Sequence, residues 1–334
     1  MNIAINGFGR IGRHTFKAGF GRKDFNIVAI NDLTDTKTLA HLLKYDTAYP
    51  TYDKKIEYDE KNIIVDGVKI PVFAQKDPSV LPWKDLQVDV VLECTGRFTN
   101  REGMELHLKA GAKKVVLSAP AKDKDVPTYV RGVNCENVKN EKSPIINNAS
   151  CTTNCIAPVM AVLEEEFGIE KAMMSTVHAY TADQNIQDGP HKDLRRARAA
   201  AESIVPTTTG AAKAVAETIP AVKGIFDGIA LRVPVVTVSL SDVTAVLKKK
   251  VTKEEINAAF VKAAKSKRFE GVLDATEEEL VSADFIGNPY SSIVDLKLTN
   301  VVGDNLVKVV AWYDNEYGYA HRLVEMAELF GAAK

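Results

Sequence analysis

The segment Gly7-Phe8-Gly9-Arg10-Ile11-Gly12 directly follows a short apolar run at residues 2–6 and opens a helical pattern. With this spacing, the first glycine permits a tight turn, the second lets a ligand approach the backbone, and the third lets helix and strand pack closely. The helix N-terminus then presents N–H groups to a phosphate. The chain is therefore expected to begin with the strand, turn and helix of a doubly wound α/β domain.

An acidic residue stands at the distance that a dinucleotide site requires. Asp32 follows the second predicted strand, residues 27–31, and lies about 20 residues beyond Gly12. A carboxylate at this place can accept hydrogen bonds from both hydroxyls of the adenosine ribose, and it repels a 2′-phosphate. The pattern favours NAD as the cofactor over NADP, and a plain glycine turn is the weaker alternative.

The two halves of the chain differ in their strand patterns. In the first half, strand-like runs alternate with helical patterns, which predicts a parallel sheet covered by helices, and a hairpin about Asp66-Gly67 is expected at residues 63–73. After Cys151 the runs are longer and alternate, which favours a mainly antiparallel sheet with helices on one side. These later runs are at residues 171–181, 229–240, 291–298 and 306–313.

We therefore predict an α/β protein with a Rossmann-type doubly wound parallel sheet and an α+β catalytic domain with a mainly antiparallel sheet. The boundary is expected near Ala149, which gives an NAD-binding domain at residues 1–149 and a catalytic domain at residues 150–316.

Composition narrows the possible classes of function. Of the 334 residues, 46% are apolar and 26% are charged, and the net charge of -1 gives no overall attraction to nucleic acid. We see no secretory signal and no apolar stretch long enough for a membrane helix. The four cysteines are too sparse for a disulfide scaffold, and none has a histidine at zinc-ligand spacing. We expect a cytoplasmic protein with no metal, no membrane contact and no primary nucleic-acid role.

Cys151 is the candidate nucleophile. It follows a predicted strand at residues 144–148 and opens an amphipathic run, so that it should begin a helix. The N–H groups and the dipole at a helix N-terminus favour a thiolate over a thiol. Cys155 is one helical turn further on and is expected to pack in the core, although its spacing also allows oxidative pairing.

His178 is the histidine best placed to act on this cysteine. It lies in the predicted strand at residues 172–181, with Thr176 and Tyr180 on the same face. From the residues alone, a buried structural histidine is an equally good interpretation.

Two further segments could bind anions. Thr207-Thr208-Thr209-Gly210 precedes a helical pattern at residues 211–217, although a threonine that caps a helix for stability alone is the more ordinary explanation. Arg232 stands in an apolar strand, where its guanidinium needs an anion or a carboxylate. The basic segment at residues 188–198 could be a nucleic-acid arm or a solvated loop, and an intersubunit loop explains it at least as well.

Together these segments resemble the phosphorylating glyceraldehyde-3-phosphate dehydrogenase family of the bacterial and eukaryotic type, over essentially the whole chain. The resemblance rests on residues 5–13, 31–32, 43–46, 93–96, 149–155, 176–181, 193–198 and 312–316. It implies that Cys151 attacks the aldehyde of glyceraldehyde 3-phosphate while His178 acts as base. Hydride then passes to NAD, and inorganic phosphate attacks the resulting thioester.

The resemblance also implies the binding residues. Thr181 and Arg232 would hold the substrate phosphate. The attacking phosphate would be held by Ser150, Thr152, Thr209 and Gly210. The NAD site would include Gly7, Gly9, Arg10, Ile11, Gly12, Asp32, Lys76, Ser118 and Asn315, with Asn315 fixing the nicotinamide carboxamide.

Further properties of the family concern assembly and cofactor choice. The final helix, residues 317–334, would complete the NAD-binding domain, and a loop at residues 181–201 would lie at the interface of a homotetramer. Leu33 and Pro190 accompany a preference for NAD. The chain departs from the family pattern at residues 48–52 and at Cys135, where histidine is frequent.

There are two rival functions, one that of a related enzyme and the other that of a binding protein. Erythrose-4-phosphate dehydrogenase shares the cysteine and histidine but differs at the phosphate pockets, where Thr181 and residues 207–210 match the glyceraldehyde-3-phosphate pattern. A secondary role in binding RNA or protein would use the cofactor groove and the basic loop.

Overall fold

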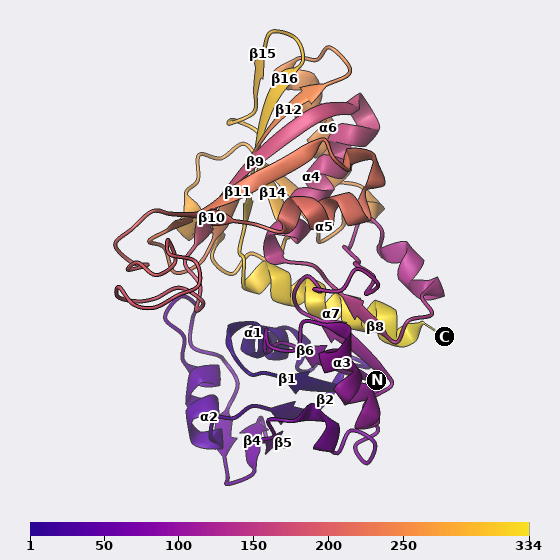
Figure 1. Cartoon of the computed structure of the whole chain (residues 1–334), viewed down its shortest axis with the longest axis vertical. Helices are drawn as coiled ribbons and strands as arrows, with labels where there is room; N and C mark the ends of the chain where they lie inside the picture. The colour runs from indigo at the N-terminus through magenta and orange to yellow at the C-terminus, as the bar shows by residue number, and fades with distance from the viewer. Residues whose placement is uncertain (334) are drawn as a thin grey trace. The chain divides into compact units, whose positions relative to one another are not determined.

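The computed structural model describes residues 1–333, and the chain forms two compact units (Figure 1). Unit 1 consists of Met1–Tyr129, Cys135–Ala149 and the residues from Ala320 onward. Unit 2 consists of Val130–Asn134 and Ser150–Tyr319. Each unit contains its own sheet, and each is described by itself.

The sheet of unit 1 has the strand order β3-β4-β5-β2-β1-β6-β7-β8. Its strands are β1 (Asn2–Asn6), β2 (Asn26–Asn31), β3 (Ile56–Tyr58), β4 (Asn62–Val65), β5 (Val68–Phe73), β6 (Val90–Glu93), β7 (Lys114–Leu117) and β8 (Ile145–Asn147). All neighbouring pairs from β5 to β8 are parallel, whereas β3, β4 and β5 pair antiparallel. The predicted doubly wound parallel sheet is confirmed.

Helices connect these strands, as alternating patterns require. They are α1 (Arg10–Gly19), α2 (Thr36–Lys44) and α3 (Arg101–Lys109). The predicted hairpin is also present, because β4 and β5 join through Asp66 and Gly67, whose φ angles are 49° and 83°. Positive φ at both central residues is the geometry of the tight turns that match strand twist.

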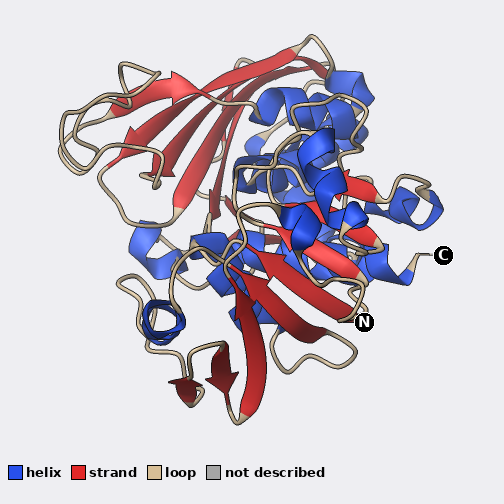
Figure 2. Ribbon diagram, turned by 60° about the horizontal axis from the view of Figure 1, so that its bottom comes forward, coloured by secondary structure: helices blue, strands red, loops and turns tan. Residues whose placement is uncertain are grey.

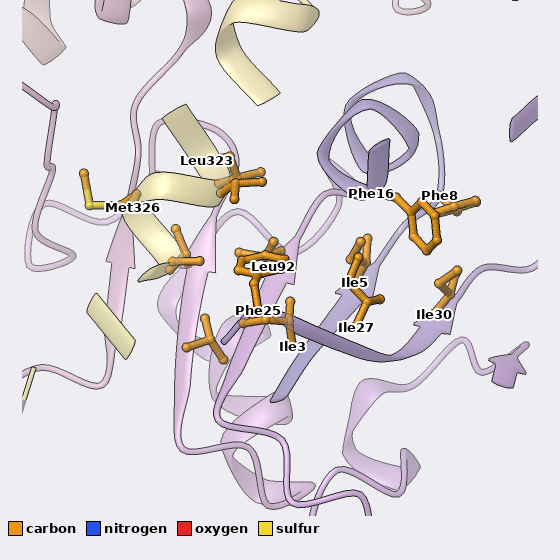
Figure 3. Packing of buried hydrophobic residues seen from close by; sticks show 14 of the residues in the cluster. Ile3, Ile5, Phe8, Phe16, Phe25, Ile27, Ile30, Leu92, Leu323 and Met326 are labelled. Carbon is orange, nitrogen blue, oxygen red and sulfur yellow. The ribbon is translucent and has the colours of Figure 1, made fainter. Parts of the chain in front are cut away.

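Buried apolar side chains cover both faces of the sheet of unit 1, and Figure 3 shows the cluster on one face. Ile3, Ile5 and Leu92 belong to the same buried cluster as Leu323 and Met326. The last two residues come from α7 (Tyr317–Ala332), which begins in unit 2 and continues into unit 1 at Ala320. The C-terminal helix thus supplies part of the core around the first strand.

The sheet of unit 2 has the strand order β10-β11-β9-β12-β16-β14-β13, with β15 paired to β16. Its strands are β9 (Ile169–Ala179), β10 (Val205–Thr208), β11 (Phe226–Val233), β12 (Ser239–Leu247), β13 (Leu273–Thr276), β14 (Ser292–Asp295), β15 (Asn300–Val302) and β16 (Leu306–Tyr313). Only the pairs β9–β11 and β13–β14 are parallel among its described strand pairs. The prediction of a mainly antiparallel sheet is confirmed.

Helices α4 (Cys151–Phe167), α5 (Ala211–Thr218) and α6 (Lys253–Ala264) cover one face of this sheet (Figures 1 and 2). The buried residues of α4 extend without interruption from Thr152 to Leu163. A helix that is apolar around most of its circumference must be buried. The start of α4 is therefore held firmly over the sheet.

One sequence-based prediction of a strand was wrong. Residues 229–240 do not form one strand, because β11 ends at Val233 and β12 begins at Ser239. Pro234 has no N–H group for a sheet, and Val238 has a φ angle of 70°, which a strand cannot contain. The apolar alternation in the sequence runs through residues 229–240, but Pro234 and the backbone at Val238 divide this stretch into two strands.

The unusual segment at residues 48–52 packs against α1. The Tyr49 ring lies 4.4 Å from the His14 ring and 5.7 Å from the Arg10 guanidinium, measured to ring centroids. The Lys17 ammonium lies over the Tyr52 ring, 5.2 Å from its centroid. The aromatic residues of this segment thus cover the side of α1 that also carries Arg10.

Within residues 1–333, no helix combines the length and the apolar character that crossing a membrane requires. In the same part of the chain, no cluster of three or more His, Cys, Asp or Glu side chains is arranged to hold a metal ion.

Candidate functional site

Unit 1 contains a pocket of about 320 Å³ beside the glycine turn. It is lined by Asn6, Gly7, Gly9, Asn31, Asp32, Leu33, Gln75, Lys76, Cys94, Thr95, Arg97 and Phe98. The structure therefore brings together four of the predicted cofactor residues, namely Gly7, Gly9, Asp32 and Lys76. The side chains of Thr95, Arg97 and Phe98 were not foreseen, although their position just after β6 is where ligands bind in open α/β sheets.

The glycines of the turn differ in what surrounds them. Gly7 has a φ angle of 92°, and a Cβ there would lie 2.7 Å from the Thr95 nitrogen. A Cβ on Gly12 would clash with the Gly7 carbonyl oxygen, whereas a Cβ on Gly9 would meet nothing within 4 Å. Gly7 and Gly12 thus permit close packing, and Gly9 keeps an open approach at the start of α1.

The start of α1 fits a pyrophosphate. Gly9 is the N-cap and provides no side-chain hydrogen bond to the helix, so the first N–H groups have no capping side chain. The neighbouring Arg10 side chain binds Asp46 at 2.6 Å, so it is the backbone of Arg10 and Ile11 that is placed for a ligand. The residues of this pocket are compatible with a dinucleotide.

Asp32 is held in place by the backbone. Its carboxylate accepts hydrogen bonds from the Phe8 N–H at 2.7 Å and from the Thr34 N–H at 3.0 Å. These bonds fix the carboxylate at the pocket edge, and its remaining lone pairs can accept ribose hydroxyls. The carboxylate that favours NAD therefore has a defined position.

We expect replacement of Asp32 by alanine to weaken the preference for NAD. A carboxylate at this position is expected to bind the ribose hydroxyls and to repel a 2′-phosphate, and alanine can do neither. The ratio of kcat/KM for NAD to that for NADP should fall by about 10-fold to 100-fold. Asp32→Asn is the matched control for charge, since it keeps a side-chain oxygen. Comparable wild-type rates with the two cofactors would contradict the role of Asp32.

A buried network of hydrogen bonds lies next to this pocket and reaches one of its residues, Thr95. The Glu93 carboxylate is fully buried and accepts from Asn6 Nδ2 at 2.5 Å and from the Thr95 N–H at 2.8 Å. Trp83 Nε1 donates to His107 Nδ1 at 3.0 Å, so His107 Nε2 carries the proton and donates to Glu93 at 3.1 Å. The network fixes Thr95, one of the pocket residues.

The remaining predicted cofactor residues lie outside the lining of this pocket. The Ser118 N–H binds the Glu93 carbonyl oxygen at 3.0 Å, next to the end of β7. In unit 2, Asn315 is buried, and its side-chain oxygen accepts a hydrogen bond from Ser239 at 2.9 Å. The amide nitrogen of Asn315 is then the end left for a ligand.

In unit 2, Cys151 is the first residue of α4, as the sequence predicts. The Ser150 hydroxyl caps this helix by accepting from the Thr153 N–H at 3.1 Å. Ala149 precedes it with a φ angle of 54°, a strained conformation for alanine, and such strain is characteristic of functional turns. The turn carries the chain from β8 into the helix that presents the sulfur.

His178 lies opposite Cys151. Its Nε2 atom is 3.5 Å from the Cys151 sulfur, and its Nδ1 atom is 2.7 Å from the Ala179 carbonyl oxygen. A carbonyl can only accept, so Nδ1 carries the proton and Nε2 presents a lone pair to the thiol. The geometry is that of a nucleophile and its base.

Burial dominates the protonation of this pair. It lowers the pKa of His178 to about 4, with a smaller contribution from the Arg232 charge, so the imidazole is neutral at neutral pH. Burial also raises the pKa of Cys151, and the Arg232 charge and the Thr152 backbone N–H oppose it only in part. The helix N-terminus favours the thiolate of Cys151, whereas desolvation of the sulfur acts in the opposite direction.

Arg232 is placed by the sheet. It is the register partner of His178 on the neighbouring parallel strand, so both side chains share one face. Its Nη1 atom donates to the Thr181 hydroxyl at 2.5 Å and to the Ala179 carbonyl oxygen at 3.4 Å. Arg232 and Thr181, predicted as a pair from sequence, are thus in direct contact.

Two charged neighbours of this pair were not predicted. Asp183 accepts hydrogen bonds from Thr181 and from Arg196. Arg196 also donates from Nε to the Thr207 hydroxyl at 3.0 Å. Arg196 belongs to the basic segment, and a cluster of arginines near a threonine run was the signal that could have identified it.

The second predicted anion pocket involves two helix starts. Thr152 is near the start of α4, and Gly210 is the N-cap of α5, where it gives no side-chain hydrogen bond. The Thr209 hydroxyl accepts from the Ala211 N–H at 3.2 Å, and α4 and α5 pack against each other. Hydroxyls and helix N–H groups are therefore available on both helices.

A dinucleotide pocket in one unit and a cysteine with its base in the other define a class of protein, the NAD-dependent oxidoreductases that use a covalent cysteine intermediate. Comparison with known proteins makes this specific. Residues 1–101 match the NAD binding domain, and residues 150–315 the C-terminal domain, of glyceraldehyde 3-phosphate dehydrogenase.

Individual relatives agree over nearly the full length. The chain is 56% identical to glyceraldehyde-3-phosphate dehydrogenase of Thermotoga maritima over 329 residues, which covers 98% of each chain. It is 54% identical to the protein of that name from Geobacillus stearothermophilus over 327 residues, covering 98% of this chain and 97% of the relative. The chain belongs to the glyceraldehyde-3-phosphate dehydrogenase family.

Proposed function

We propose that the protein oxidises and phosphorylates glyceraldehyde 3-phosphate, with NAD as hydride acceptor and inorganic phosphate as second substrate. The observation that carries this proposal is the Cys151–His178 pair, with a neutral Nε2 lone pair 3.5 Å from the sulfur. The relatives from Thermotoga maritima and Geobacillus stearothermophilus carry the name of this activity. Neither is named for the rival erythrose-4-phosphate activity, which we do not favour.

The first half of the reaction forms and oxidises a covalent adduct. His178 Nε2 accepts the Cys151 proton as the sulfur bonds to the aldehyde carbon, and it then passes this proton to the carbonyl oxygen to give a hemithioacetal. His178 then accepts the hydroxyl proton as the carbon loses a hydride. NAD, when bound, supplies the acceptor for those two electrons. The product on Cys151 is a thioester.

The second half releases the product. An oxygen of inorganic phosphate attacks the thioester carbon, the carbon–sulfur bond breaks, and the acyl phosphate 1,3-bisphosphoglycerate leaves. Cys151 departs with the electron pair of that bond and regains a proton. The energy of oxidation is thereby conserved in the acyl phosphate.

Each phosphate requires a cationic or N–H-rich pocket. We assign Thr181 and Arg232 to the phosphate of the substrate, since their contact leaves further guanidinium N–H groups for an anion. We assign Ser150, Thr152, Thr209 and Gly210 to the attacking phosphate. Arg196 and Asp183 hold the first pocket in shape through Thr181 and Thr207.

The cofactor residues are assigned on the same basis. Gly7, Gly9 and Gly12 shape the turn, the backbone of Arg10 and Ile11 receives the pyrophosphate, and Asp32 takes the ribose. The assignment of Lys76, Ser118 and Asn315 follows the family. Asn315, fixed by Ser239, would hold the nicotinamide carboxamide.

One assay tests the activity. We expect NADH to form from glyceraldehyde 3-phosphate and NAD in a reaction that requires inorganic phosphate for turnover. Erythrose 4-phosphate at the same concentration should react more slowly. Equal turnover without phosphate, or faster turnover of erythrose 4-phosphate, would refute this function.

We also propose a homotetramer. Unit 2 exposes large apolar side chains in the loop before β10 and in β9: Ile186 is 86% exposed, Leu194 81%, and Ile204 and Met173 68% each. Large apolar side chains with this much exposure are frequent at subunit interfaces. Light scattering should give four times the mass of one chain, and a monomer at micromolar concentration would contradict the proposal. The basic loop then lies in an interface, so that a primary nucleic-acid role is not needed to explain it.

We further propose a cytoplasmic location. All four cysteines are free thiols in the structure, and unpaired cysteines are usual in reducing compartments.

A further inference from the structure

Three buried hydroxyl groups form a chain that leads to the proposed site of phosphate attack. Thr152 at the start of α4, Thr176 in β9 and Tyr313 at the end of β16 are each at most 5% exposed. The Tyr313 hydroxyl lies 2.9 Å from the Thr152 hydroxyl and 2.9 Å from the Thr176 hydroxyl. The Thr176 hydroxyl lies 3.2 Å from the Leu240 carbonyl oxygen.

The carbonyl at one end sets the direction of every hydrogen bond in this chain. A carbonyl can only accept, so Thr176 donates its one hydroxyl proton to the Leu240 carbonyl oxygen. Thr176 must then accept the proton of Tyr313, and Tyr313 must accept the proton of Thr152. The Thr152 hydroxyl is therefore left with lone pairs, and no proton, for a ligand.

The burial of Tyr313 supports this direction. Burial raises the pKa of Tyr313, with smaller contributions from Cys151 and Cys155, so its hydroxyl keeps its proton and stays a donor to Thr176. Tyr313 also packs edge-on against His178, with ring centroids 6.0 Å apart, which fixes the position of its hydroxyl.

We propose that Tyr313 is a positioning residue that makes the Thr152 hydroxyl an acceptor, and that the pocket thereby selects an oxyanion that carries a proton over one that carries none. The proposal rests on the assignment of Thr152 to the attacking phosphate. Inorganic phosphate keeps at least one proton at neutral pH and can donate it to Thr152. Sulfate has no proton to donate, so its oxygens face the lone pairs of Thr152.

The selection also has a consequence for orientation. A phosphate that donates its P–OH to Thr152 turns its unprotonated oxygens away from that hydroxyl. Those oxygens are the better nucleophiles, so the hydrogen bond directs one of them toward the thioester carbon. Tyr313 does not touch the phosphate and acts through Thr152.

The test compares three oxyanions as ligands of the phosphate pocket in steady-state kinetics. Arsenate, which carries a proton as phosphate does, replaces phosphate as substrate, and sulfate is measured as an inhibitor competitive with phosphate. In the wild type, sulfate should bind at least about tenfold more weakly than arsenate, which is the effect of one hydrogen bond to a charged group. Equal binding of sulfate and arsenate would overturn the proposal without any variant.

Two variants reverse the direction of the Thr152 proton by different means. In Tyr313→Phe, the Thr152 hydroxyl loses the oxygen to which it donates. In Thr176→Val, the Tyr313 hydroxyl loses its acceptor and can donate its proton to Thr152 instead. Both release the Thr152 proton to the pocket, so the inhibition constant of sulfate should fall by about tenfold relative to the KM for phosphate. The KM for arsenate should change by the same factor as the KM for phosphate. An unchanged ratio of the sulfate inhibition constant to the KM for phosphate in the variants would refute the proposal.

Thr152→Val provides the matched control. If Tyr313 acts through Thr152, adding Tyr313→Phe to Thr152→Val should leave the ratio of sulfate to phosphate unchanged. A further change in the double variant would show that Tyr313 acts by another route, and would overturn the proposal. Failure of the wild type to require phosphate is a separate result, which would refute the proposed function.

Discussion

Replacement of Cys151 by serine should abolish phosphate-dependent NADH formation, with a loss on the order of 10⁴-fold or more, as expected when the nucleophile of a covalent mechanism is removed. A serine hydroxyl holds its proton far more strongly than a thiol, and His178 has little driving force to remove it. The rate of NADH formation with saturating substrates measures the effect.

Cys155→Ser is the matched control for this variant. Cys155 is buried one turn further along α4, where its sulfur lies 3.8 Å from Ser292 Oγ and from the Ala311 carbonyl oxygen. This variant should retain activity within a fewfold. If Cys151→Ser kept a tenth of the wild-type rate, or if Cys155→Ser lost as much as Cys151→Ser, the assignment of the nucleophile would be wrong.

Replacement of His178 by asparagine should lower the turnover rate by about 10²-fold to 10⁴-fold, the usual contribution of a general base. Asparagine can still bind the Ala179 carbonyl oxygen through its amide, but it cannot accept the Cys151 proton. The variant should still bind NAD, because the substitution leaves Asp32 and the glycine turn unchanged. Retention of full turnover would refute the role of His178 as base.

The pH dependence of this pair has a defined sign. Because burial lowers the pKa of His178 to about 4, the imidazole remains an unprotonated base well below its ordinary value. The acid limb of the wild-type rate should therefore lie near pH 4 instead of near 6.5. In His178→Asn, deprotonation of Cys151 depends on solvent alone, and burial raises its pKa. Alkylation of Cys151 by iodoacetamide should then require a higher pH than in the wild type.

Local chemistry made the first half of the fold predictable. The glycine spacing and Asp32 identified the turn and the cofactor, since each residue acts through its own neighbours in the chain. The Asp66-Gly67 hairpin was predictable for the same reason, because two residues determine a tight turn.

Contacts between distant residues were not predictable from one sequence. Thr152 and Tyr313 are 161 positions apart in the sequence and meet at 2.9 Å only because α4 and β16 pack together. The burial of Cys151, which raises the pKa of its thiol, was hidden for a related reason. The helix N-terminus is a local feature, whereas burial of the sulfur depends on the folded sheet beneath it.

The final helix has a consequence for biosynthesis. Residues of α7 such as Leu323 and Phe330 fill the core around Ile3 and Ile5, at the opposite end of the chain. During translation the first strands leave the ribosome long before the side chains that cover them, whereas most of unit 2 is a continuous stretch of chain. The first half of the nascent protein must therefore wait, with an apolar surface uncovered, until the last residues are made. This order of synthesis exposes it to aggregation and to chaperones.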